Sequence, residues 1–107
     1  MSPKFENKNK FKAKIFRALS DSVRIDILEY LRDGEKCVCE IIPHVNLIQP
    51  VVSRHLRILK ECGVVRFRKD GNRRLYSITD QQIFKIIDGV TPELANTFIT
   101  KMLEQIV

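Results

Sequence analysis

The triplet Asp70-Gly71-Asn72 is the feature that most restricts how this 107-residue sequence folds. It separates two segments, 64–69 and 73–78, in which apolar and polar residues alternate. Asp-Gly is a favoured pair in tight turns, and the alternation is typical of strands that bury one face. The sequence therefore predicts a two-stranded hairpin, and the lysines and arginines beside the turn give it a basic tip.

Four segments ahead of the hairpin are predicted to be helices: 5–19, 22–33, 38–45 and 49–62. Ser20-Asp21-Ser22 supplies capping side chains for the second, and Gly34 ends it. Pro50 stands in the first turn of the fourth, where its missing N–H costs no hydrogen bond, and Gly63 ends it. The first segment has an apolar stripe that requires a partner surface and consists of Phe5, Phe11, Ile15, Phe16 and Leu19.

Two more helices are predicted after the hairpin. Asp80 is expected to cap the first, which runs to about residue 88 and is broken by Gly89. Thr91-Pro92-Glu93 starts the second, in which apolar residues recur every four positions. This stripe is a second candidate dimer surface and consists of Leu94, Phe98, Met102 and Ile106.

Short helices followed by a hairpin are the element order of a winged helix-turn-helix. The predicted fold class is therefore mainly α with a small β-hairpin wing. A chain of 107 residues holds one modest core, so we expect a single domain covering residues 1–107. Within it, residues 37–63 form the helix-turn-helix and 64–79 the wing, while 1–19 and 91–107 form dimerisation helices.

Positive charge is concentrated in one part of the chain. Residues 53–76 contain eight lysines and arginines against two acidic residues, whereas the rest of the chain holds eleven of each kind. A generally basic surface would spread this excess along the sequence. The concentration instead indicates a polyanionic partner, and duplex DNA suits the predicted fold.

The helix at 49–62 has two different faces. Val52, Leu56 and Leu59 form an apolar edge, and polar residues line the opposite face. Such side chains hydrogen-bond base edges or phosphates, although a solvated polar face has the same pattern. The predicted DNA contacts from this helix are Gln49, Pro50, Ser53, Arg54, His55 and Arg57, with His55 equally compatible with a packed structural role. Those from the wing are Arg68, Lys69, Asn72, Arg73 and Arg74, and they would contact phosphates or the minor groove.

Three cysteines, two of them in the triplet Cys37-Val38-Cys39, do not make a disulfide framework. Free thiols or a thiolate metal site fit this pattern better. No apolar run is long enough to span a bilayer, and the charged beginning of the sequence is unlike a signal peptide. We therefore expect a cytoplasmic protein without a membrane partner.

The sequence resembles the ArsR/SmtB metalloregulator repressors. The resemblance lies in ALSDSVRIDILEYL at 18–31, EKCVCEI at 35–41 and QPVVSRHLRILKECGVVRFRKDGNRRLYSI at 49–78, which cover well over half of the chain. Members of that family are dimeric repressors paired through their first and last helices. They leave their operators when a metal or metalloid, or in some members thiol oxidation, alters the dimer.

The resemblance implies that Cys37 and Cys39 are inducer ligands, whereas DNA binding itself requires no metal. Thiolates select soft ions such as As(III), Cd(II), Pb(II) or Zn(II). Residues two apart lie about 200° apart around a helix, so both sulfurs reach one ion only where the helix start is distorted.

The sequence departs from the family's ligand patterns. Ile42 and Ile58 stand where family members carry further cysteines, and Glu40 and His44 are the nearby candidates for a third ligand. Cys62 is expected to be an ordinary buried thiol.

Two alternatives to a metal-released repressor remain open. One is a DNA-binding regulator that ignores metals or responds to thiol oxidation. The other is a winged-helix protein-interaction module, against which the basic wing argues. An enzyme is not expected, because the sequence contains no paired-carboxylate, Ser/His/Asp or phosphate-loop pattern.

Overall fold

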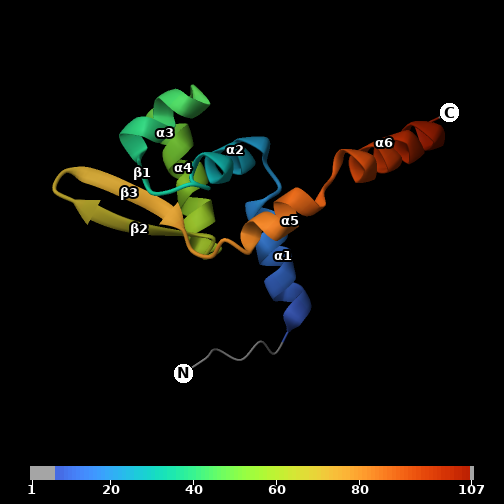
Figure 1. Ribbon diagram of the computed structural model, residues 1–107, viewed down its shortest axis with the longest axis horizontal. Coiled ribbons are helices and arrows are strands. Elements are labelled where there is room, and N and C mark those ends of the chain that lie inside the picture. The colour runs from blue at the N-terminus through green and yellow to red at the C-terminus, as the bar shows by residue number, and fades with distance from the viewer. Residues whose placement is uncertain (1–6, 107) are drawn as a thin grey trace.

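The computed structural model describes residues 7–106, and Figure 1 shows how their elements are arranged. Phe5, which the sequence assigned to the first helix, lies outside the described residues. The wing and α6 extend from opposite sides of the helical body, and α1 leads away from it at a third point (Figure 1). The elements are α1 (Lys8–Ala18), α2 (Ser22–Tyr30), β1 (Lys36–Cys37), α3 (Val38–Val45), α4 (Gln49–Glu61), β2 (Val65–Asp70), β3 (Arg73–Ile78), α5 (Ile83–Gly89) and α6 (Pro92–Ile106).

The predicted mainly α fold with a hairpin wing is confirmed, and most helix boundaries lie close to their expected places. Asp21 caps α2 by accepting a hydrogen bond from the Val23 amide at 2.8 Å. This helix ends at Tyr30, three residues earlier than predicted, and the chain then turns to Gly34, which has a φ of +153°. Asp80 accepts from the Gln82 amide in a turn ahead of α5, so it precedes the helix that it was expected to cap.

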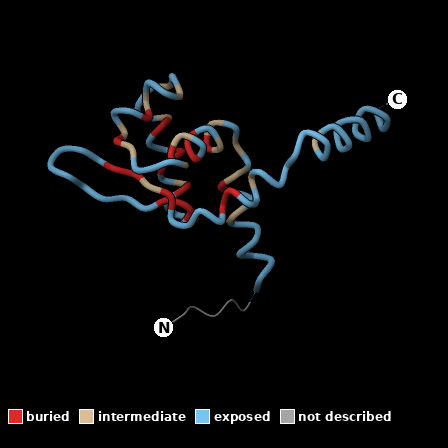
Figure 2. The backbone as a smooth tube through the Cα atoms, viewed as in Figure 1, coloured by how far each residue is buried: buried red, intermediate tan, exposed pale blue. Residues whose placement is uncertain are grey.

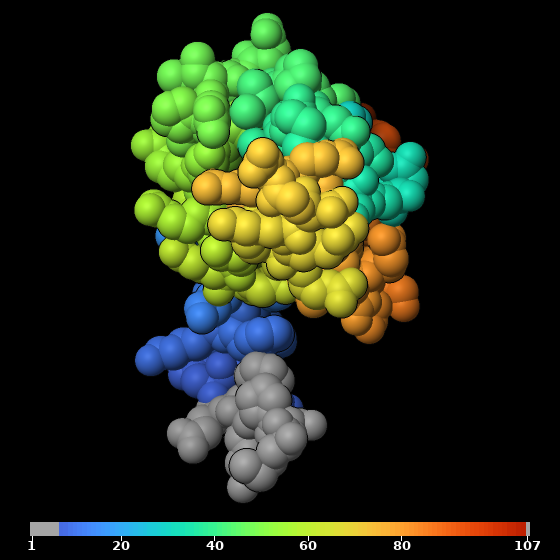
Figure 3. All heavy atoms as spheres, turned by 90° about the vertical axis from the view of Figure 1, so that its left-hand side faces the viewer, coloured from blue at the N-terminus to red at the C-terminus, as the bar shows by residue number. Residues whose placement is uncertain are grey.

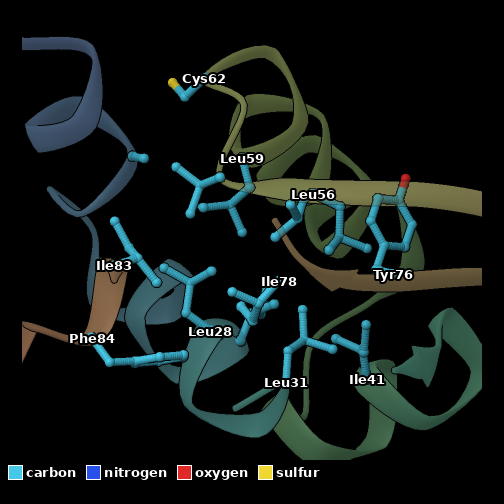
Figure 4. Packing of buried hydrophobic residues seen from close by; sticks show 14 of the residues in the cluster. Leu28, Leu31, Ile41, Leu56, Leu59, Cys62, Tyr76, Ile78, Ile83 and Phe84 are labelled. Atoms are coloured by element: carbon cyan, nitrogen blue, oxygen red, sulfur yellow. The ribbon is translucent and has the colours of Figure 1, made fainter. Parts of the chain in front are cut away.

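The core lies where α2, α3 and α4 meet the inner half of the sheet and the start of α5. Figure 2 shows the buried residues gathered in this region, and Figure 4 shows their side chains pointing into one shared interior. Burial of these apolar side chains is the main favourable contribution to folding. The largest fully buried side chains are Ile27, Leu28, Leu31, Ile41, Val52, Leu56 and Leu59.

The wing belongs to a three-stranded antiparallel sheet with the order β1-β3-β2. The predicted hairpin is present, with Asp70 opposite Arg73 and a φ of +62° at Gly71 in the turn. The third strand corrects the prediction of a two-stranded ribbon. It consists of Lys36 and Cys37, which pair with Tyr76 and Leu75. A strand of two residues carries no periodic signal, so only the distant partner reveals it.

Helices α1 and α6 leave most of their apolar side chains uncovered. None of the α6 residues is buried, and Ala18 is the one buried residue of α1. Phe98 is 65% exposed and Phe16 is 60% exposed. Among the described residues, no helix is both long and apolar enough to cross a membrane.

Alanine substitutions of two isoleucines, one buried and one exposed, test where the core lies. Ile27 is fully buried, whereas Ile48 is 68% exposed just ahead of α4. Ile27→Ala should lower the free energy of unfolding by about 2–5 kcal/mol, because it removes buried carbons and leaves a cavity. The matched change Ile48→Ala should cost about 0.5 kcal/mol or less. Urea unfolding of both variants measures the difference, and equal losses would contradict this packing.

Candidate nucleic-acid interface

Helix α4 presents its polar face to solvent because its apolar edge is anchored in the core. Val52, Leu56 and Leu59 are at most 1% exposed. Side chains on the other side of the helix axis must then point outward. The exposed side chains there are Gln49, Pro50, Ser53, Arg54 and Arg57. The N-terminal half of α4 therefore offers hydrogen-bonding groups to a ligand outside the domain.

His55 does not belong to this exposed face, which corrects its assignment as a DNA contact. Its side chain is 8% exposed. The imidazole Nδ1 lies 3.2 Å from Nη1 of Arg24, a residue of α2. The structure therefore shows the alternative role that the sequence left open for His55, that of a packed structural residue.

The wing places basic side chains at its tip and beside α4. Lys69, Asn72, Arg73 and Arg74 are all exposed around the turn at Gly71. Figure 3 looks toward the hairpin, drawn in yellow, and shows it beside the green surface of α4. Of the predicted contacts, Gln49, Ser53 and Arg57 of α4 share one cleft with Asn72 and Arg74 of the hairpin.

Arg68 differs from the other wing residues because it has an acidic partner. Its Nε and Nη2 donate to the two carboxylate oxygens of Glu35, each at 2.8 Å. These hydrogen bonds hold the pKa of Glu35 below its usual value, and the charges of Arg73 and Arg66 act in the same direction. Glu35 precedes β1, and no local pattern could have revealed a partner 33 residues away.

Cys37 and Cys39 lie against the same surface. A cleft of about 510 Å³ is lined by both cysteines, by Ser53 and Arg57 of α4, and by Arg74 of the wing. Cys37 is 4% exposed, whereas Cys39 is exposed. A chemical change at the thiols would therefore take place beside the side chains that were predicted to contact DNA.

The two cysteines come together because Cys37 is not helical. Its backbone is extended, with a ψ of 147°, and it forms both the end of β1 and the N-cap of α3. Its Sγ accepts a hydrogen bond from the Cys39 amide at 3.1 Å, and the two sulfurs form a disulfide. The expected separation of about 200° holds only within a helix, so it does not apply to this pair.

The described residues hold no group of three or more histidine, cysteine or acidic side chains able to bind a metal. Glu40 accepts from the Cys37 amide at 3.0 Å in a capping box, and His44 stacks on Tyr30 with a ring-centroid distance of 3.8 Å. In this arrangement neither residue is grouped with the two cysteines as a third ligand. The disulfide corrects the expectation of free thiols at this pair, which would offer thiolate donors to a soft ion only after reduction; no complete three-coordinate site is found among the described residues. Cys62 is a free, buried thiol at the end of α4, as predicted.

The chain resembles known regulators along most of its length. Residues 21–66 match the family described as bacterial regulatory protein, arsR family. An uncharacterized HTH-type transcriptional regulator of Methanocaldococcus jannaschii is 43% identical over 76 residues, which cover 70% of this chain and 85% of that protein. An arsenical resistance operon repressor of Staphylococcus aureus is 37% identical over 76 residues, which cover 71% of this chain and 73% of the repressor.

Solved structures with a similar fold belong to the same group of regulators. A homodimeric winged helix-turn-helix DNA-binding domain of Mycobacterium bovis, described as a possible ArsR-family regulator, has a TM-score of 0.70 and 27% sequence identity. The superposition covers 84% of this chain and 86% of that domain. The similar proteins are transcriptional regulators and not enzymes. The chain therefore belongs to the ArsR/SmtB family of winged helix-turn-helix transcriptional regulators.

Proposed function

We propose that this chain is a homodimeric repressor that binds duplex operator DNA through α4 and the wing, and that chemistry at Cys37 and Cys39 controls the binding. One observation carries the proposal: a single cleft is lined by both cysteines, by α4 residues and by wing residues. An effector bound at the thiols would be in reach of the DNA-contacting side chains.

The proposed division of labour follows from the position of each side chain. Gln49, Ser53 and Arg54 lie in the first half of α4, which is the part of a recognition helix that meets base edges. Arg73 and Arg74 lie at the wing, where guanidinium groups suit phosphates. Nε of Arg57 lies 3.8 Å from Oε1 of Glu61 in an exposed ion pair. Exposed ion pairs are weak, so a DNA phosphate could replace Glu61 as the partner of Arg57.

The thiol pair fits two kinds of effector. Soft ions such as As(III), Cd(II), Pb(II) or Zn(II) prefer thiolate ligands, and a similar repressor is named for arsenical resistance. The Cys37–Cys39 disulfide favours a second candidate, in which an oxidant joins the two thiols and takes up their two electrons and two protons. A regulator that ignores both kinds of effector would use the same DNA surface.

The dimer is proposed to form through α1 and α6. Leu94, Phe98, Met102 and Ile106 occupy one face of α6, and each is at least 39% exposed. An exposed apolar stripe of this kind marks a site of protein association. A second copy of this chain is the proposed occupant, since the similar Mycobacterium bovis domain is described as homodimeric.

The role of the wing is tested with the double variant Arg73→Ala/Arg74→Ala. The experiment first requires that the unaltered protein binds DNA from the region upstream of its own gene. The double variant should bind every duplex more weakly and flatten the dependence of log K on log salt by about one unit per lost phosphate contact. Lys10→Ala/Lys14→Ala removes the same charge from exposed positions of α1 and is the matched control, with analytical ultracentrifugation used to check that its oligomeric state is unchanged. Fluorescence anisotropy at several salt concentrations measures both slopes. An unchanged slope would place the wing away from DNA, and a protein without DNA affinity would favour the protein-interaction alternative.

The effector is identified by comparing Cys37→Ser/Cys39→Ser with the unaltered protein. Operator affinity of the reduced proteins is measured alone, with each of the four ions, and after oxidation by a small disulfide. We expect one treatment to release the unaltered protein while the double variant stays bound. Cys62→Ser, which changes the buried thiol, should respond like the unaltered protein. Binding that ignores every treatment would remove the sensing role.

The dimer surface is tested by Phe98→Glu/Met102→Glu. Both side chains are exposed in the single chain, so folding should survive, whereas buried charges should disrupt the dimer. Thr97→Glu/Thr100→Glu adds the same charge to the other side of α6 and should leave the dimer intact. Analytical ultracentrifugation gives the oligomeric state, and a dimer that persists in the first variant would exclude this face.

A further inference from the structure

Arg24 is a buried cation at the centre of the helical body. Its side chain belongs to α2 and is 7% exposed. Burying a guanidinium is unfavourable unless its donors are matched by acceptors. Each of the three nitrogen atoms of the Arg24 guanidinium has at least one partner, so its burial is compensated by polar contacts.

These contacts join three helices. Nε donates to the Ala18 carbonyl at 3.0 Å, and Nη2 donates to the Arg17 carbonyl at 2.9 Å and to Ser20 Oγ at 3.1 Å. Carbonyls in the last turn of a helix lack partners within the helix and attract positive charge. Nη1 faces the fourth acceptor, Nδ1 of His55 in α4, at 3.2 Å. One side chain of α2 thus connects the end of α1 to the middle of α4.

The contact with His55 defines the chemistry of the pair. A guanidinium has donors and no acceptor, so Nδ1 of His55 acts as the acceptor in this contact. Asp21 is the carboxylate near both groups. Its pKa is lowered, chiefly by its hydrogen bond from the Val23 amide and further by the charge of Arg24. Asp21 is thereby engaged in capping α2.

The hydrogen bond between Arg24 and His55 is directional, so it can fix the rotation of α4 about its axis, which the apolar contacts leave free. Val52, Leu56 and Leu59 bury one edge of α4, but apolar burial has no preferred direction and tolerates small rotations of the helix. His55 follows Ser53 and Arg54 immediately, so any rotation of α4 about its axis moves those side chains together with the imidazole.

We propose that Arg24 is a positioning residue which, through His55, fixes the orientation of α4 relative to α1. The inference rests on the proposed function, in which α1 belongs to the dimer surface and α4 reads DNA. In a dimer, the angle between these helices sets the distance between the two recognition helices. That distance must match half-sites one helical turn, about 34–36 Å, apart. Arg24 and His55 therefore determine which half-site spacing the protein prefers.

The experiment measures affinity for the operator and for versions whose half-site spacing is longer or shorter by one base pair. His55→Leu removes the acceptor, whereas His55→Asn places an amide oxygen close to the position of Nδ1. We expect His55→Leu to lose about tenfold or more of the preference for the native spacing, as befits a hydrogen bond to a charged group. His55→Asn should retain most of that preference.

Arg24→Met and the double variant Arg24→Met/His55→Leu complete a cycle. If the two residues act as one unit, the double variant should show no greater loss of spacing preference than the worse single variant. Thermal unfolding and ultracentrifugation accompany each measurement. The His55 variants keep the test decisive if Arg24→Met does not fold.

Each outcome has a distinct meaning. Affinity that falls equally for all spacings, in step with lost thermal stability, would overturn the positioning role and leave the pair merely structural. Equal behaviour of His55→Leu and His55→Asn would overturn the part played by the Nδ1 acceptor. Failure of the proposed function itself would appear differently, because the unaltered protein would then bind none of the three duplexes.

Discussion

The burial of one edge of α4 determines where the other functional groups lie. Val52, Leu56 and Leu59 pack into the interior formed by α2, α3, β3 and α5, and this anchoring turns Ser53, Arg54 and Arg57 outward. Because a helix advances about 100° per residue, an inward edge and an outward face arise from the same geometry. The apolar contacts supply the driving force, and the polar contact between Arg24 and His55 adds direction to it.

The short strand β1 connects the cysteines to the wing. Cys37 pairs with Leu75 of β3 and also begins α3, so one residue belongs to both the sheet and the helix-turn-helix. Glu35, two residues earlier, holds Arg68 of β2 through two hydrogen bonds. The segment from Glu35 to Cys39 therefore lies beside both parts of the proposed DNA surface. This proximity gives an effector at the thiols a short route to the groups that it would have to displace.

Much of this arrangement could be predicted because it depends on local pattern. The amphipathic spacing of α4, the turn at Gly71 and the cap at Asp21 each act over a few residues, and the structure contains all three. The exposed faces of α4 and the wing followed from the same periodicities. The sequence did not predict contacts between residues that are far apart in the chain. Three such contacts have no signature in the sequence around either partner. They are the Glu35–Arg68 ion pair, the pairing of Lys36 and Cys37 with β3, and the contact between Arg24 and His55.

The cysteine triplet shows the same division. Its composition indicated thiol chemistry, but a helical spacing argument separated the two sulfurs, whereas the extended backbone of Cys37 brings them together. The sequence by itself determined the helices, the hairpin, the basic surface and the family, because periodicity, turn chemistry and charge are properties of neighbouring residues. The tertiary structure decided which polar side chains are engaged inside the protein and which stay exposed on the surface proposed to bind DNA. That choice depends on which residues the packing of the core brings within hydrogen-bonding distance, and no local pattern encodes such a distance.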